Sequence, residues 1–127
     1  MSGNTDLNKI IDTLKRAAAS VRALEAEAED ALINKEDTST YRSKLEQKAM
    51  LIIDLEGEVE DLLVVLDPRL SRRIQGGLSR FAASAERGLG LDSLFYLSAL
   101  LYPEDHAEGE KNDLEAFIEN LEQNLKP

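Results

Sequence analysis

Several residue types are scarce in this sequence, and each scarcity excludes a class of chemistry. Its 127 residues include no cysteine and only one histidine. Disulfide scaffolds, thiolate metal sites, thiol nucleophiles and sites built from several histidines are therefore excluded. No apolar run approaches the roughly 18 residues of a membrane-spanning helix, and the N-terminal residues lack the basic-then-apolar layout of a secretory signal. We expect a cytoplasmic protein with no cofactor and no membrane contact.

Acidic residues outnumber basic ones, but the excess is not spread evenly along the chain. The formal net charge is −10, from 25 acidic and 15 basic residues with the histidine neutral. Residues 68–91 reverse this sign because they hold five arginines and one glutamate. An acidic protein repels nucleic acid and anionic membranes on average, so this basic segment is the main anomaly of the sequence.

Two long segments carry apolar residues at alternating spacings of three and four. In the first, predicted as a helix from about residue 4 to residue 33, they are Leu7, Ile10, Leu14, Ala17, Val21, Leu24, Ala28 and Ala31. In the second, predicted over about 40–66, the same spacing gives Tyr41, Leu45, Lys48, Ile52, Leu55, Val59, Leu62 and Leu66. Lys48 is the one polar member. The short polar break between the segments predicts that the two helices fold back as a long antiparallel hairpin.

The charges of the two segments favour one register for this hairpin, in which opposite residue numbers sum to about 73. One set of complementary charges is then Glu25, Glu27, Glu29 and Asp30 opposite Arg42, Lys44 and Lys48. A second set is Glu56, Glu58, Glu60 and Asp61 opposite Lys15 and Arg16. Each exposed pair contributes only a few tenths of a kcal/mol, so the pattern supports the register more than the stability.

A third helix is predicted over about 68–87, beginning at the Asp67-Pro68 cap and closed by Gly88 or Gly90. The pair Gly76-Gly77 inside it is either a hinge or a close contact. Its arginines fall on one face, and they are Arg69, Arg72, Arg73, Arg80 and Arg87. Its opposite face is apolar, with Leu70, Ile74, Leu78, Phe81, Ala85 and Leu89.

Two further helices complete the prediction. Asp92 caps an apolar helix over 93–102, which Pro103 ends and which we expect to be buried on most sides. Asn112 with Glu115 forms a capping box for the last helix. The apolar face of that helix comprises Leu114, Phe117, Ile118, Leu121 and Leu125.

The predicted fold is therefore all-α, a helical bundle of one long hairpin and three shorter helices. We expect a single domain over 1–127 with four parts: the hairpin over 1–67, the arginine-bearing and apolar helices over 68–102, an acidic loop over 103–112 and an amphipathic helix over 113–127. The hairpin seam is buried either within one chain or across a dimer. No motif in the sequence identifies a family.

The arginines of the third helix are the first candidate site. We favour their pairing with acidic helices of this chain or of a second subunit. They are alternatively a surface for an acidic protein, or for nucleic acid or another phosphate ligand, since arginine binds phosphate in a bidentate fork. The aromatic and amide side chains that base readers place among basic residues are missing from this face.

The acidic pairs Glu27/Asp30 and Glu58/Asp61 are the second candidate site. Carboxylates from neighbouring helices hold magnesium in all-α nucleotide pyrophosphatases, because magnesium prefers oxygen ligands. In the expected register the two pairs lie on the order of 20 Å apart, so only a dimer would bring them together. We favour a solvated helix face for these residues and a surface position for His106.

The apolar fourth helix is the third candidate, as core or as an interface. Its residues are Leu94, Phe95, Tyr96, Leu97, Leu100, Leu101 and Tyr102. The sequence favours a non-enzymatic scaffold or adaptor that forms a homodimer and binds another protein through helix packing. The alternatives are nucleic-acid or phosphate-ligand binding through the arginines, and magnesium-dependent nucleotide hydrolysis.

Overall fold

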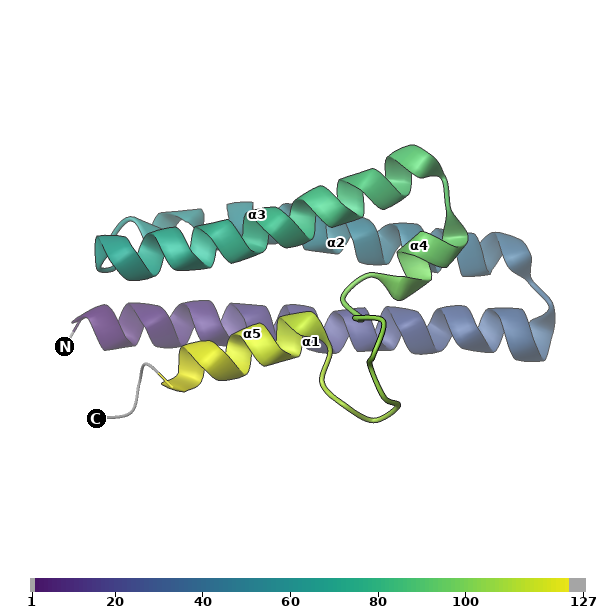
Figure 1. The fold of residues 1–127 in the computed structure, drawn as a ribbon, viewed down its shortest axis with the longest axis horizontal. Helices are drawn as coiled ribbons and strands as arrows, with labels where there is room; N and C mark the ends of the chain where they lie inside the picture. The colour runs from purple at the N-terminus through teal and green to yellow at the C-terminus, as the bar shows by residue number, and fades with distance from the viewer. Residues whose placement is uncertain (1, 124–127) are drawn as a thin grey trace.

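The computed structural model describes residues 2–123, and the side chains of residues 5–123. This described part contains five α-helices and no strand, which confirms the predicted all-α class. The four longer helices run along the long axis of the molecule, as Figure 1 shows. None of the described helices is long and apolar enough to cross a membrane.

The two longest helices, α1 (Ser2–Lys35) and α2 (Thr38–Leu63), lie side by side and run in opposite directions (Figure 1). Asp37 begins α2, because its carboxylate accepts a hydrogen bond from the backbone N–H of Thr40 at 3.0 Å and so satisfies a free amide of the first turn. Leu14 of the α1 seam and Ile52 of the α2 seam are at most 2% exposed, whereas the predicted seam residues Leu24, Tyr41 and Leu62 are only half-buried. Residues 64–66 lie beyond α2, which ends earlier than predicted.

The third helix, α3 (Pro68–Leu91), begins at the predicted Asp67 cap but is longer than the sequence indicated. The prediction that Gly88 or Gly90 ends it is wrong. Asp92 ends it instead, in a left-handed conformation with φ 49°. Glycine is therefore not needed at this helix end, since a short polar side chain tolerates the left-handed region.

The pair Gly76-Gly77 lies inside this continuous helix and marks a close contact. A β-carbon at Gly77 would lie 2.4 Å from Cε1 of the Phe117 ring, whereas the space beside Gly76 is open. The ring of Phe117 also meets Phe81 edge to face, with ring centroids 5.7 Å apart. Gly77 thus lets α5 (Asp113–Glu122) approach α3 at this point.

The fourth helix, α4 (Leu94–Ala99), has six residues and differs from the prediction at both ends. Ser93, not Asp92, caps it, because the Ser93 hydroxyl accepts from the backbone N–H of Tyr96 at 3.1 Å. It also ends before Pro103, since the chain turns at Leu101 with φ 75°. That left-handed backbone is held by the Leu101 side chain, which is buried in the core.

The last helix, α5, begins with the predicted capping box, which is confirmed. The Asn112 side chain accepts from the backbone N–H of Glu115, and the Glu115 carboxylate accepts from that of Asn112, both at 2.9 Å. Its apolar face packs along α1 within the same chain. Leu125, the last apolar position predicted for this helix, lies outside the described residues.

The apolar seams of α1 and α2 are buried within one chain. α3 packs along α2, α5 packs along α1, and α4 lies against α2 and α3. The sequence left open whether the hairpin seam is buried within one chain or across a dimer. In this structure a second copy is not required to cover it.

Candidate interaction surfaces

The seven residues of the predicted apolar interface divide between the core and the surface. Leu97, Leu100 and Leu101 are buried, and Leu94, Tyr96 and Tyr102 are half-buried. Phe95, in contrast, is 84% exposed. The expectation that this helix is buried on most sides therefore holds for six of the seven residues, and Phe95 is the exception.

A second apolar side chain stands near Phe95 at the corner between α3 and α4. Leu91, the last residue of α3, is 62% exposed. It precedes Phe95 by four residues across the short α3–α4 connection. The end of α3 and the start of α4 thus each present one large apolar side chain to solvent.

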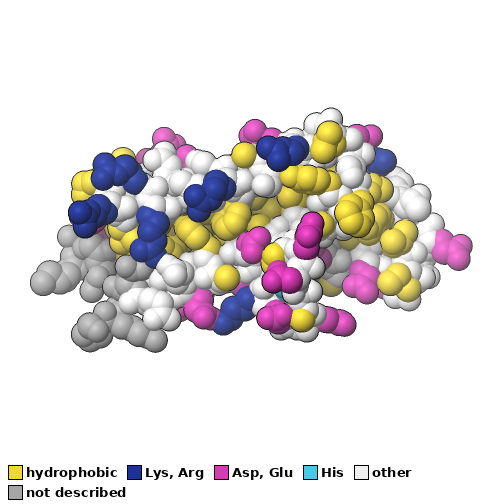
Figure 2. Space-filling view, in the orientation of Figure 1, with side chains coloured by type: hydrophobic (Ala, Val, Ile, Leu, Met, Phe, Trp, Pro, Cys, Tyr) yellow, Lys and Arg dark blue, Asp and Glu magenta, His cyan; other side chains and the backbone are white. Residues whose placement is uncertain are grey.

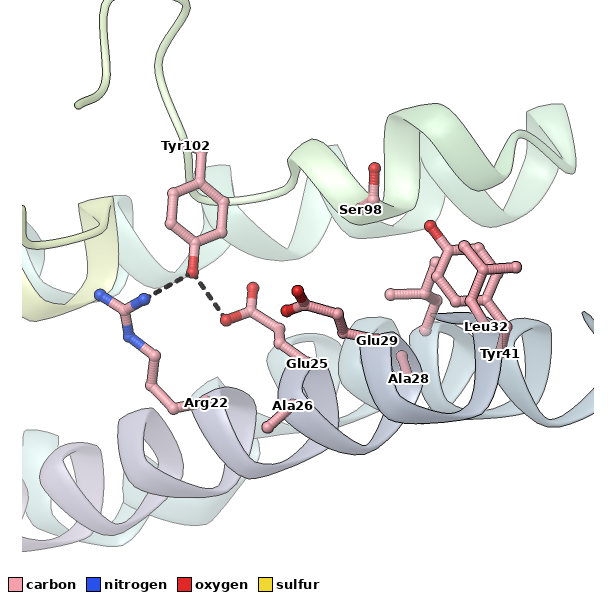
Figure 3. A pocket seen from close by; sticks show the side chains of 10 residues that line it. Arg22, Glu25, Ala26, Ala28, Glu29, Leu32, Tyr41, Ser98 and Tyr102 are labelled. Atoms are coloured by element: carbon pink, nitrogen blue, oxygen red, sulfur yellow. Dashed lines mark hydrogen bonds between the residues drawn. The ribbon is translucent and has the colours of Figure 1, made fainter. Parts of the chain in front are cut away.

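An open groove of about 470 Å³ lies between α4 and the α1–α2 pair. Its apolar lining comes from Ala26, Ala28, Leu32 and Leu45, and two tyrosine rings, Tyr41 and Tyr102, also line it. Figure 3 shows Glu25 and Glu29 extending from α1 on the side of Tyr102 and Ser98. The groove is thus partly apolar and aromatic, and Arg22, Glu25 and Glu29 of α1 give it a charged edge.

Lys48, the polar member of the α2 seam, is completely buried beneath this groove. Its Nζ lies 2.8 Å from Oε2 of Glu25 and donates to the backbone oxygens of Leu97 at 3.1 Å and Ser98 at 3.3 Å. Burial lowers the pKa of Lys48, and the hydrogen bond and charge of Glu25 oppose that shift. Through one ion pair with α1 and two hydrogen bonds to α4, this ammonium group of α2 ties the three helices together.

Tyr102 extends these contacts toward α5. Its hydroxyl donates to Oε1 of Glu25 at 2.6 Å and accepts from Nη1 of Arg22 at 3.0 Å (Figure 3). Arg22 also holds Glu115 in a two-point contact, Nε–Oε2 at 3.1 Å and Nη2–Oε1 at 2.7 Å. We call Lys48, Glu25, Tyr102, Arg22 and Glu115 the anchor network, since it joins four of the five helices and the loop before α5.

The pKa values of Tyr102 and Glu115 in the anchor network are shifted as well. Burial, followed by the hydrogen bond to Glu25, raises the pKa of Tyr102 to about 12. The Arg22 guanidinium lowers the pKa of the Glu115 carboxyl. Both shifts favour the protonation states that the observed hydrogen bonds require, a neutral phenol and a charged carboxylate.

The five arginines predicted on one side of α3 are all exposed, and we call them the arginine face: Arg69, Arg72, Arg73, Arg80 and Arg87. Figure 2 shows basic side chains gathered along α3. Arg73 donates to the Asn120 side chain of α5. No carboxylate in the described part of the chain forms an ion pair with any of the five. The pairing expected within this chain is therefore wrong, and pairing with a second subunit stays a prediction.

The register expected from charge is present at one end of the α1–α2 pair. Besides Lys48–Glu25, the Lys44 Nζ lies 3.0 Å from Oε2 of Glu27. Other expected pairs are wrong, because α3 and α5 supply different carboxylates: Lys15 pairs with Glu122 at 2.9 Å, and Arg42 pairs with Asp92. A register worked out for two helices alone cannot predict ion pairs with carboxylates from other helices.

The acidic candidates are not assembled into a metal site within the described residues. Among these, no group of three or more histidine or carboxylate side chains is placed to hold a metal ion. Glu27 pairs with Lys44, and Asp30 pairs with Lys35 at 3.3 Å. The magnesium hypothesis thus still requires a second chain.

The single histidine lies in the loop before α5. His106 is half-buried, its ring meets that of Tyr102 edge to face at 4.8 Å, and its Nε2 is 2.9 Å from the backbone oxygen of Glu110. These contacts give His106 a role in packing the loop.

No family model, curated protein or solved structure matches this chain. The function proposed for this chain therefore rests on the surfaces described above. The anchor network is the feature that the sequence interpretation missed, although Lys48 on an apolar seam was a signal of it.

Proposed function

We propose that this chain is a non-enzymatic helical module that self-associates and binds another protein through the surface around α4. The observation that carries this proposal is the exposure of Phe95 on α4, the helix whose Ser98 lines an apolar groove, together with exposed Leu91 at the end of α3. Fully burying one such side chain contributes about 1.5–3 kcal/mol, and aromatic side chains are enriched among the residues that dominate binding. The geometry favours binding through packing over catalysis, because the ionisable side chains beside the groove, Arg22, Glu25 and Tyr102, contact one another in the anchor network.

The solution mass of the full chain tests self-association. We expect light scattering to give twice the 14.1 kDa chain mass at both low and high salt, because an apolar contact is not screened. Phe95→Asp should reduce the mass to that of one chain. The matched control is Val64→Asp, since Val64 is 78% exposed but lies after α2, away from α4. A wild-type monomer at every concentration contradicts self-association.

A second candidate function is favoured by the arginine face. Its guanidinium groups have no carboxylate partner in the described chain, so they are available to a phosphate-bearing ligand. We expect any binding of a labelled oligonucleotide to weaken steeply with salt. Replacing Arg73 and Arg80 by Glu should abolish it, while the same reversal at Lys9 and Arg16 of α1 should preserve most of it.

Two outcomes decide against this second candidate. Equal loss in both double reversals would indicate net charge alone rather than a site on α3. A dimer that dissociates as salt rises would instead assign the arginines to the contact between subunits.

A further inference from the structure

Phe95 and the groove beside α4 belong to the same side of the molecule. Ser98 lines the groove, and it follows Phe95 by three residues on α4, so the two side chains share one face of that helix. Phe95 itself is not among the groove residues and projects into solvent. A projecting aromatic ring and an open apolar groove therefore lie next to each other.

We infer that the groove is the docking site for Phe95 of a second copy of this chain, and that two copies exchange this contact about a two-fold axis. This inference rests on the proposed self-association and names its interface. In a two-fold dimer each contact occurs twice, so a surface must be complementary to itself. A ring beside its own receptor groove meets that requirement, since both insertions form at once.

The lining of the groove suits a phenyl ring. Ala26, Ala28 and Leu32 give apolar contacts, and the side chains of Tyr41 and Tyr102 bring aromatic rings to the lining, against which a further ring packs favourably. The volume of about 470 Å³ lies within the range of pockets that hold small organic ligands, so it accommodates one aromatic side chain.

Charge complementarity supports a second copy as the occupant. Arg87 precedes Leu91 by four residues, which places it on the same side of α3, and Glu29 lines the groove. Both are exposed, and neither forms an ion pair with a described residue. Docking Phe95 into the groove of the partner brings the Arg87 side of one copy toward Glu29 of the other.

Cysteine cross-linking tests the contact directly, because the natural chain has no cysteine. A tagged Phe95→Cys chain mixed with an untagged Ala26→Cys chain should form a mixed disulfide of distinct mobility under mild oxidation. The control replaces Ala26→Cys with Val64→Cys, and no mixed disulfide is expected there. Substituting these exposed positions leaves the core intact, which circular dichroism and thermal melting verify.

A charge exchange gives an independent readout. Arg87→Glu and Glu29→Arg should each raise the dimer dissociation constant about threefold to tenfold, because each places like charges together. The dissociation constant of the double variant should lie within about twofold of the wild-type value, since both ion pairs can then form again with their charges exchanged.

The outcomes separate this inference from the function on which it rests. A wild-type dimer that resists Phe95→Asp and forms no mixed disulfide overturns the exchange of Phe95 but leaves self-association standing. Additive weakening in the double charge variant also overturns the stated geometry. A wild-type monomer overturns both.

Discussion

Two cation-rich regions of this molecule differ in how their charges are satisfied. In the anchor network, Lys48 is buried against Glu25 and Arg22 holds Glu115 at two points. Along the arginine face of α3, five guanidinium groups are exposed and none has a carboxylate partner within the described residues. The acidic residues of this chain are numerous, so scarcity of carboxylates does not explain the difference.

The difference shows which cations need a counter-charge within the fold. A cation removed from water must have a counter-charge, because the desolvation penalty is several kcal/mol. An exposed arginine keeps its hydration and needs no partner. The anchor network therefore belongs to the fold, whereas the arginine face is available for an external contact. Three substitutions test this contrast, beginning with the largest effect.

Glu25→Leu should lower the free energy of unfolding by about 3–5 kcal/mol, because it leaves the buried ammonium of Lys48 without a counter-charge. Urea denaturation measures the loss. The control is Glu27→Leu, which breaks the exposed pair with Lys44 across the same two helices and should cost about 0–1 kcal/mol. Adding Lys48→Met to Glu25→Leu should recover most of the loss. Equal losses of stability in Glu25→Leu and Glu27→Leu would contradict the contrast between buried and exposed cations.

Tyr102→Phe should cost about 1–3 kcal/mol at neutral pH, since the Oε1 atom of Glu25 loses its hydroxyl donor. The pH dependence gives the specific signature. The pKa of Tyr102 is raised from 10.0 to about 12, so the folded state holds the phenolic proton more tightly than the unfolded state. This stabilisation is complete below pH 10.0 and is lost as pH rises toward about 12.

The comparison of wild type and Tyr102→Phe isolates that signature. All other side chains are the same in the two proteins, so the stability difference between them should shrink as pH rises from neutral into this alkaline range. If the stability difference between the two proteins does not change with pH, Tyr102 ionises equally well in the folded and the unfolded state.

Much of this fold follows from local sequence patterns. The three-and-four spacing predicted the long helices, and the Asn112–Glu115 box predicted the start of α5, because both signals depend on neighbours within one helix. Opposed charges also predicted the pairs Lys48–Glu25 and Lys44–Glu27. These features need no knowledge of distant segments.

The features that the sequence did not reveal depend on contacts between distant segments. Gly88 lies inside α3 and does not end it. Position 88 is a glycine because Tyr96 and Leu97 pack against it, and a β-carbon there would lie 2.8 Å from Leu97. Lys48 is buried because α4 covers it, and Tyr102 reaches Arg22 across 80 positions of sequence. Helical periodicity assigns a face to each residue but does not state which helix covers that face.

The smallest expected effect belongs to the arginine face and completes the contrast. Arg80→Ala should change the free energy of unfolding by no more than about 0.5 kcal/mol, because the exposed guanidinium has no ion pair to lose. Arg22→Ala is the matched control, since the Arg22 side chain is also 42% exposed but donates to Glu115, Tyr102 and Glu110. It should cost about 1–2 kcal/mol. Similar losses of stability for the two variants in urea denaturation would mean that Arg80 contributes to the fold. That result would contradict the view that the arginine face is available to an external partner.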